Sequence, residues 1–152
     1  MLKINKNIET VKIINTKEEF RELYIERYNK NYKFLDLRNL DFDSTIEEMD
    51  FQFMGCEAEV IDVTGWNTEH FITTAYMFAK CPNLKRLIGL NTWDVSSVRT
   101  MARMFWNCPE LEDIGEINNW KFRNDISLES IFKDSPKVKI PKVFVKYIRG
   151  TY

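Results

Sequence analysis

The sequence predicts an α/β solenoid in which about four similar units stack between two caps. The first observation is that Trp66, Trp93 and Trp120 follow one another at intervals of 27 residues. The second is that phenylalanine and proline columns repeat with the same period and register: Phe78, Phe105, Phe132, Pro82, Pro109 and Pro136. A shared period of this length indicates supersecondary units that bury apolar faces against their neighbours.

The repetition sets the predicted domain organisation. Four units are expected at 34–59, 60–86, 87–113 and 114–140, in one domain, after an N-terminal cap of strand and helix at 1–33 and before a C-terminal cap at 141–152. The first unit is irregular, because its Phe53 and Cys56 precede Phe78 and Cys81 by only 25 residues. Such irregularity is typical of a terminal unit.

Each unit is expected to hold one strand and one short helix. The stretch 60–63 alternates Val, Ile, Asp and Val as a half-buried strand does. Ser96 or Ser97, and Ser44 with Glu47 in the first unit, stand where helix N-caps are expected. Apolar residues then recur at helical spacing, as Val98, Met101, Met104 and Phe105 do.

The two flanks are interpreted as caps. Thr16 and Glu19 form a predicted capping box ahead of a helix whose apolar face, Phe20, Leu23, Tyr24 and Tyr28, would cover the first unit. At the other end, apolar residues with interleaved lysines predict an extended cap: Val138, Ile140, Val143 and Val145.

Composition limits the possible functions. The chain has 152 residues, 44% of them hydrophobic, and a net charge of −1, which argues against direct electrostatic binding to nucleic acid or anionic membranes. It has no apolar run of about 18 residues and no apolar stretch of the signal-peptide kind at its start. We therefore expect no membrane span and a cytoplasmic location, or the cell surface if a leader has been removed.

One segment carries a family resemblance. The residues Trp93, Asp94, Ser96, Val98, Met101, Met104, Phe105 and Cys108 fit the pattern Trp-Asp-x-Ser-x-Val-x-x-Met-x-x-Met-Phe-x-x-Cys. This pattern resembles the repeat of the BspA-like bacterial leucine-rich-repeat proteins over residues 34–140, most specifically at 87–113. The resemblance implies a leucine-rich-repeat fold and a binding role, since that family consists mostly of surface proteins associated with adhesion or host contact. This chain would be a short member without a visible leader or anchor.

Residues with reactive side chains favour structural roles. Cys56, Cys81 and Cys108 are in register with one another and with Ser135, and no Cys-x-x-Cys pair occurs, so buried thiols are favoured over metal ligands. His70 is the only histidine and lies in a polar turn. We therefore expect no metal, no cofactor and no enzymatic activity, an unrecognised enzyme being the least favoured alternative.

The aromatic columns have two interpretations. One residue of each kind per unit favours buried packing over a ligand-stacking stripe. The predicted structural set comprises Trp66, Trp93, Trp120, Phe53, Phe78, Phe105 and Phe132, with the cysteines beside them. Trp106 lies outside these columns and is interpreted as an exposed interface anchor or a half-buried residue.

Charge is unevenly distributed. Residues 36–62 hold nine acids and one base, net −8, whereas residues 133–149 hold six bases and one acid, net +5. The acidic end would serve solubility and oppose end-to-end stacking, or it would dock on a basic protein surface.

These observations lead to a hypothesis of a non-catalytic protein–protein interaction module with a rigid surface and an acidic N-terminal end. The partner is a protein of unknown identity, and the chain is expected to be a monomer or a weak oligomer. The alternatives are a phage or mobile-element inhibitor of a host nucleic-acid-handling or defence protein, and a short BspA-like surface adhesin. Candidate partner-binding residues are the outward strand positions, the acidic end and the isolated tryptophan: Asp36, Arg38, Asp62, Thr64, Asn91, Glu116, Asn118, Asp43, Glu47, Glu48 and Trp106.

Overall fold

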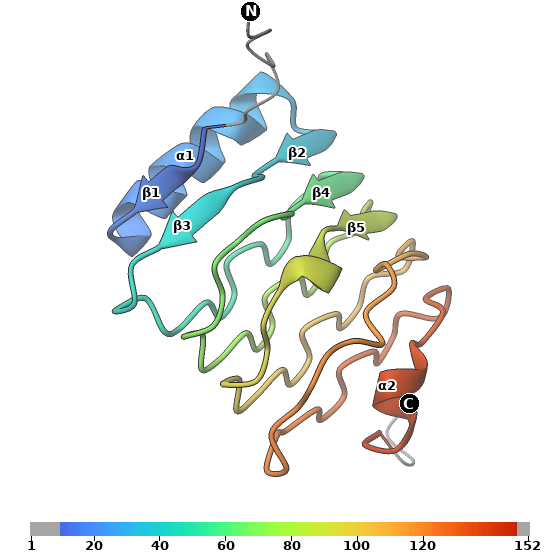
Figure 1. The fold of residues 1–152 in the computed structure, drawn as a ribbon. Coiled ribbons are helices and arrows are strands. Elements are labelled where there is room, and N and C mark those ends of the chain that lie inside the picture. Colours follow the sequence, from blue (N-terminus) through green and yellow to red (C-terminus); the bar gives the residue numbers. More distant parts are fainter. Residues whose placement is uncertain (1–9, 149–152) are drawn as a thin grey trace, which may run out of the picture.

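A computed structural model describes residues 10–148 of the chain (Figure 1). The strands are three residues long, and one longer helix lies near the N-terminus. In chain order the elements are β1 (Lys12–Ile14), α1 (Lys17–Lys30), β2 (Phe34–Asp36), β3 (Leu40–Phe42), β4 (Val60–Asp62), β5 (Arg86–Ile88), a 3₁₀ turn (Leu90–Thr92) and α2 (Lys142–Val145).

The strands form two small parallel sheets. β1 pairs with β3, and β2, β4 and β5 form a second sheet in that order. Parallel bridges extend the pairing beyond the strands, as from Arg86 to Asp113 and from Thr73 to Thr100. Figure 1 shows these segments side by side between α1 at one end and α2 at the other.

The predicted leucine-rich-repeat-like solenoid of strand-plus-helix units is wrong. The described residues form a small α/β domain with two short parallel sheets and two α-helices. Both helices lie outside 34–140, so none of the four predicted units contains the expected helix. The predicted helix N-caps at Ser44 and Ser96 lie in turns instead.

The backbone between 98 and 108 explains why no helix forms there. Arg103 and Asn107 have φ angles of 54° and 55°, and such left-handed residues interrupt an α-helix. Alternate N–H groups donate to carbonyls of the segment that lies alongside. The N–H of Phe105, for example, donates to the Ile131 carbonyl at 3.0 Å. The apolar residues still recur every third or fourth position, because successive tight turns bring those positions to the core.

The start of α1 is confirmed. The N–H of Glu19 donates to the Thr16 hydroxyl oxygen at 3.1 Å, and the Glu19 carboxylate accepts from the N–H of Asn15 at 2.8 Å. Phe20 and Leu23 are buried beneath the helix. The helix therefore lies over one end of the core, as its apolar face predicts.

A stack of four phenylalanine rings runs through the core. Phe53, Phe78, Phe105 and Phe132 lie 5.1, 5.9 and 5.4 Å apart in succession, with interplanar angles of 3°, 4° and 6°.

Perpendicular rings close both ends of this stack. Phe20 of α1 meets Phe53 at 90° and 5.9 Å, and Phe144 of α2 meets Phe132 at 89° and 5.1 Å. The extended C-terminal cap predicted from 138–145 is thus wrong at 142–145, where the short helix α2 brings Phe144 into the core.

The tryptophans pack beside the phenylalanine stack. The rings of Trp66 and Trp93 lie 5.3 Å apart at an angle of 19°. The indole N–H of Trp93 donates to the Val63 carbonyl at 3.2 Å, and those of Trp66 and Trp120 donate to main-chain carbonyls at 2.5 and 2.9 Å. Each ring therefore buries its apolar area and satisfies its one donor.

The three cysteines are buried and free. The thiol of Cys81 donates to the Phe53 carbonyl at 3.1 Å, and that of Cys108 donates to the Phe78 carbonyl at 3.0 Å. At the next equivalent position the Ser135 hydroxyl makes the same bond, at 2.5 Å. The hydrogen bond with Cys108, together with burial, raises the pKa of the Cys81 thiol, so this group stays protonated.

Candidate protein-interaction surfaces

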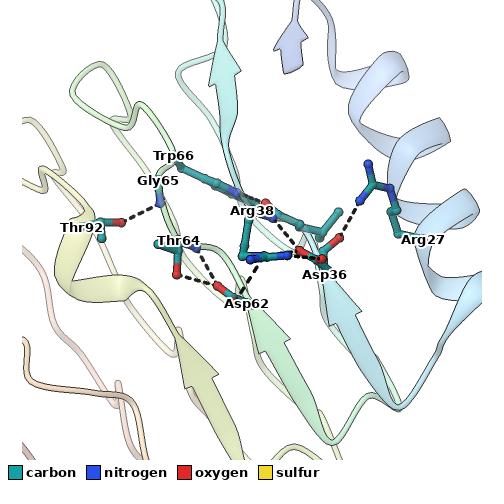
Figure 2. Close-up of polar contacts among 9 residues, drawn as sticks. Arg27, Asp36, Arg38, Asp62, Thr64, Gly65, Trp66 and Thr92 are labelled. Atoms are coloured by element: carbon teal, nitrogen blue, oxygen red, sulfur yellow. Dashed lines mark hydrogen bonds and ion pairs between the residues drawn. The ribbon is translucent and has the colours of Figure 1, made fainter. Parts of the chain in front are cut away.

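Aspartates are the last residues of two neighbouring strands of the larger sheet, and their carboxylates stabilise the turns that follow (Figure 2). The carboxylate of Asp36 accepts from the N–H of Arg38 at 3.2 Å, and that of Asp62 accepts from the N–H of Thr64 at 3.0 Å. An aspartate that bonds the N–H two residues on stabilises a turn after a strand. These residues, predicted as outward binding positions, therefore have a local structural role.

The charges of this cluster are compensated within the chain. The Arg38 guanidinium makes two 2.9 Å bonds to the Asp36 carboxylate and lies 3.9 Å from the Asp62 carboxylate. The bonds from Arg38 hold the pKa of Asp36 below its usual range. Arg27 reaches from α1 and donates to the Asp36 main-chain carbonyl at 3.5 Å (Figure 2). A partner binding here would compete with these contacts.

Thr64 bonds to Asp62 and packs closely against the next segment. The Thr64 hydroxyl donates to the Asp62 carboxylate at 2.6 Å, and Asp62 is only 8% exposed. Gly89 packs against Thr64 with a φ of 97°, and a Cβ at that glycine would lie 2.4 Å from the Thr64 backbone. The close approach requires glycine at position 89.

The other three predicted strand-face residues are exposed: Asn91, Glu116 and Asn118. Asn118 accepts from the N–H of Val143 at 3.1 Å, which holds α2, and the Asn91 carbonyl accepts from the Asn119 amide at 3.1 Å. Glu116 and Asn118 line a cavity of about 510 Å³ between residues 112–118 and 139–142. These two hydrogen bonds lie within residues 91–143, apart from the Asp36–Arg38 pair.

The predicted acidic end is divided between turns and exposed positions. Asp43 accepts from the Thr45 N–H at 2.9 Å and from its hydroxyl at 2.6 Å, and these bonds lower the pKa of Asp43. Glu47 and Glu48 are exposed, and Glu48 is bridged to Thr73 in the parallel row. Their carboxylates remain available to a partner.

A second surface was largely missed from the sequence. We call Phe51, Met54, Tyr76, Arg103 and Trp106 the aromatic surface. Phe51 is 52% exposed and Met54 is 44% exposed. The Phe51 ring stacks on Tyr76 at 4.9 Å, and Tyr76 meets Trp106 edge-on at 6.1 Å. Three successive segments therefore contribute to one row of aromatic rings.

Cations hold this row in place. The Arg103 guanidinium donates to the Tyr76 hydroxyl at 2.6 Å, and the Lys80 ammonium lies 5.0 Å from the centre of the Trp106 ring. Trp106 is half-buried, and its N–H donates to the Asp134 carboxylate at 3.2 Å. Of the whole surface, Trp106 alone was predicted as a partner-binding residue.

The backbone explains how the aromatic surface is positioned. Phe51, Tyr76 and Arg103 have φ angles of 63°, 56° and 54°, an uncommon region for bulky side chains. Their N–H groups donate to the adjoining segment, that of Phe51 to the Ala75 carbonyl at 3.1 Å. The three residues occupy one column of the 25- and 27-residue spacing, and that shared column is the signal that would have identified them.

Reactive side chains take part in packing. His70 lies edge-on to Phe71 at 5.5 Å, and the thiols donate to main-chain carbonyls. In residues 10–148 there is no group of three His, Cys, Asp or Glu side chains that could hold a metal ion. The same residues include no helix long and apolar enough to cross a bilayer.

Comparison with known protein families gives a match over most of the chain. Residues 20–142 match a family described as Mycoplasma protein of unknown function, DUF285. No curated protein and no solved structure matches the chain. The matched segment covers most of the 152 residues and includes the phenylalanine stack and the aromatic surface. The chain belongs to the DUF285 family.

Proposed function

We propose that this chain is a non-catalytic protein-binding domain and that its partner docks on the aromatic surface. The observation that carries the proposal is the row formed by the exposed ring of Phe51 and the half-buried rings of Tyr76 and Trp106, with Arg103 bonded to Tyr76. Aromatic residues, methionine and arginine are the types enriched at protein–protein interfaces. The aromatic surface offers all of these side chains in one place.

The rigidity of the aromatic surface supports the same proposal. The N–H of Tyr76 donates to the Ala102 carbonyl at 3.0 Å, and that of Arg103 donates to the Glu129 carbonyl at 2.9 Å. A surface held by such bonds loses little conformational entropy when a partner binds. The engagement of His70 and the cysteines in packing supports a role without catalysis.

The aromatic surface is favoured over the predicted strand face because of charge pairing. Asp36 and Arg38 already satisfy one another through two 2.9 Å bonds, so a partner would first have to break them. At the aromatic surface, by contrast, Phe51 and Met54 expose apolar area that binding would remove from water.

We also propose that this DUF285 member is related to the BspA-like proteins. The pattern from Trp93 to Cys108 supports this relation. A shared origin with proteins that contact other proteins would agree with the binding role. The relation assigns no partner to this chain.

The test is a comparison of two variants against a captured partner. Proteins bound by the full chain from a lysate of its source are identified, and the affinity of the main one is measured. Phe51→Ala with Met54→Ala should weaken binding at least tenfold, about 1.4 kcal/mol. Ile25→Ala is the matched control, since Ile25 is an exposed apolar residue of α1, 51% exposed, outside the aromatic surface.

The two outcomes separate clearly. Loss of binding in the double variant, with normal binding by Ile25→Ala and unchanged melting of both, supports the aromatic surface as the contact. Equal affinity of the double variant and the unmodified chain contradicts the proposal. So does a capture in which the double variant retains every protein that the unmodified chain retains.

A further inference from the structure

The outer edge of β1 presents main-chain groups away from its sheet. The Lys12 N–H donates to the Asn39 carbonyl at 3.0 Å, and the Asp43 N–H donates to the Ile14 carbonyl at 2.8 Å. In a parallel pair, alternate residues bond to the neighbouring strand. The N–H and C=O of Ile13 therefore point away from β3, and β1 is the outer strand of its two-stranded sheet.

Helix α1 forms a wall along this edge. A groove of about 350 Å³ lies between β1 and α1, and its lining includes Ile13, Glu19, Glu22, Leu23 and Glu26. The lining also includes Lys12, so the groove borders the edge of β1 that carries the outward N–H and C=O of Ile13. The groove thus has the position that an added strand would take.

The two faces beside the β1 edge differ in chemistry, since one is apolar and the other is acidic. On the outer face, Val11 is 57% exposed and Ile13 is 62% exposed. On the helix side, Glu22 and Glu26 are four residues apart and share one face of α1, and both are exposed. Successive side chains of a strand point to opposite faces of its sheet. The matching sequence would therefore alternate apolar and basic residues.

We propose that the β1 edge binds an extended segment of another protein, which adds as a strand beside β1. Its main chain bonds to the N–H and C=O of Ile13, its apolar side chains cover Val11 and Ile13, and its basic side chains face Glu22 and Glu26. Main-chain bonds supply affinity in this mode, and side chains on alternate faces supply specificity. This surface goes beyond the aromatic surface and uses none of its residues.

The occupant is another protein rather than a second copy of this chain. Two copies paired through their β1 edges would bring Glu22 and Glu26 of both α1 helices to the same groove. Like charges so placed repel one another. A basic segment from a partner has the opposite charge and meets no such repulsion.

The first experiment uses two labelled synthetic octapeptides and the full chain. One alternates valine and lysine, the other alternates valine and glutamate, and binding is followed by fluorescence anisotropy. We expect the lysine peptide to bind at least tenfold more tightly, and its affinity to fall as salt is raised. Equal affinities for the two peptides would overturn the proposal.

Variants then separate the strand edge from general acidity. Ile13→Pro removes the outward N–H and leaves the β1–β3 bonds of Lys12 and Ile14, so it should weaken binding at least tenfold while melting changes little. Glu22→Lys with Glu26→Lys should reverse the preference between the peptides. Glu47→Lys with Glu48→Lys, exposed acids outside the groove, is the matched control and should keep the preference.

Two results would overturn the proposal at this stage. One is unchanged binding of the lysine peptide by a folded Ile13→Pro variant. The other is an unmodified chain that sediments as a dimer and becomes a monomer with Ile13→Pro, which would assign the edge to a second copy. Phe51→Ala with Met54→Ala should bind the lysine peptide normally, so failure here and failure of the aromatic surface are distinguishable.

Discussion

Two columns of side chains lie two positions apart in the same segments. They differ in how much the residue type varies from one segment to the next. The buried column is phenylalanine four times: Phe53, Phe78, Phe105 and Phe132. The outer column changes at every position: Phe51, Tyr76, Arg103 and Ser130. Both columns share one backbone geometry, since all four outer residues have φ between 53° and 63°.

The difference shows that close packing restricts the residue type in the buried column and does not restrict it in the outer column. Inside, each ring stacks on the next within 5.9 Å, so a side chain of another shape would leave a void or a clash. Outside, the side chain has only to reach solvent or a neighbour, so its identity is free to match a partner. Repetition therefore marks the core of this protein, and variation within the same spacing marks its candidate contact.

The largest effect is expected in the middle of the buried column. Phe105→Ala removes a ring that stacks on Phe78 and on Phe132. The free energy of unfolding should fall by about 3–5 kcal/mol, as for other large-to-small substitutions in cores. Urea denaturation measures this loss, and a loss below about 1 kcal/mol would contradict the assignment of Phe105 to the core.

A smaller effect is expected beside that column. Cys108→Ser should cost about 1 kcal/mol or less, because Ser135 already makes the equivalent bond to a main-chain carbonyl. Cys108→Val, which is similar in size but lacks a donor, leaves the Phe78 carbonyl unsatisfied. It should cost about 1–3 kcal/mol in the same denaturation experiment. The reverse order would show that volume rather than hydrogen bonding governs this position.

The outer column should hardly affect stability. Phe51→Ala removes a ring that is 52% exposed, so unfolding should change by less than about 1 kcal/mol. Tyr76→Ala should cost more than Phe51→Ala, because it also removes the bond from Arg103. Thermal melting of both variants beside Phe105→Ala gives the comparison, and an outer variant as damaging as Phe105→Ala would remove the distinction between the columns.

The smallest effect concerns a turn carboxylate outside both columns. Bonds from the Ser96 hydroxyl and N–H lower the pKa of Asp94. Its contribution to stability is complete above the pKa of the unfolded chain, near 4, and is lost as pH falls through the lower folded value. The stability advantage over Asp94→Asn should therefore shrink in acid. An advantage that is constant from pH 7 to pH 2 would contradict this role.

The sequence predicts side-chain burial in this protein better than it predicts backbone conformation. A spacing of 25 or 27 residues places Trp66, Trp93 and the four phenylalanines in register with their equivalents, and all six are buried. The capping box at Thr16 predicts α1 because a local pattern determines a helix start. No local pattern distinguishes the turns of 98–108 from a helix, because buried residues recur every third or fourth position in both.

The candidate surfaces were harder to predict for a related reason. Trp106 stands out in the sequence because it lies outside the tryptophan column, whereas Phe51, Tyr76 and Arg103 share a column without sharing a residue type. Their left-handed conformations have no glycine to indicate them. The β1 edge depends on a strand of only three residues beside a helix, and that arrangement exists only once tertiary structure is formed.

The perpendicular rings of Phe20 and Phe144 have a consequence for how the protein could lengthen by duplication of an internal segment. Among the four stacked rings, Phe20 contacts Phe53 at one end and Phe144 contacts Phe132 at the other. Duplication of residues 87–113 would therefore insert one more ring without altering either terminus, moving α2 about 4.8 Å further from α1. The same event would copy Arg103 and Trp106, so an unequal crossover would lengthen the core and enlarge the outer row of aromatic and basic side chains in one step.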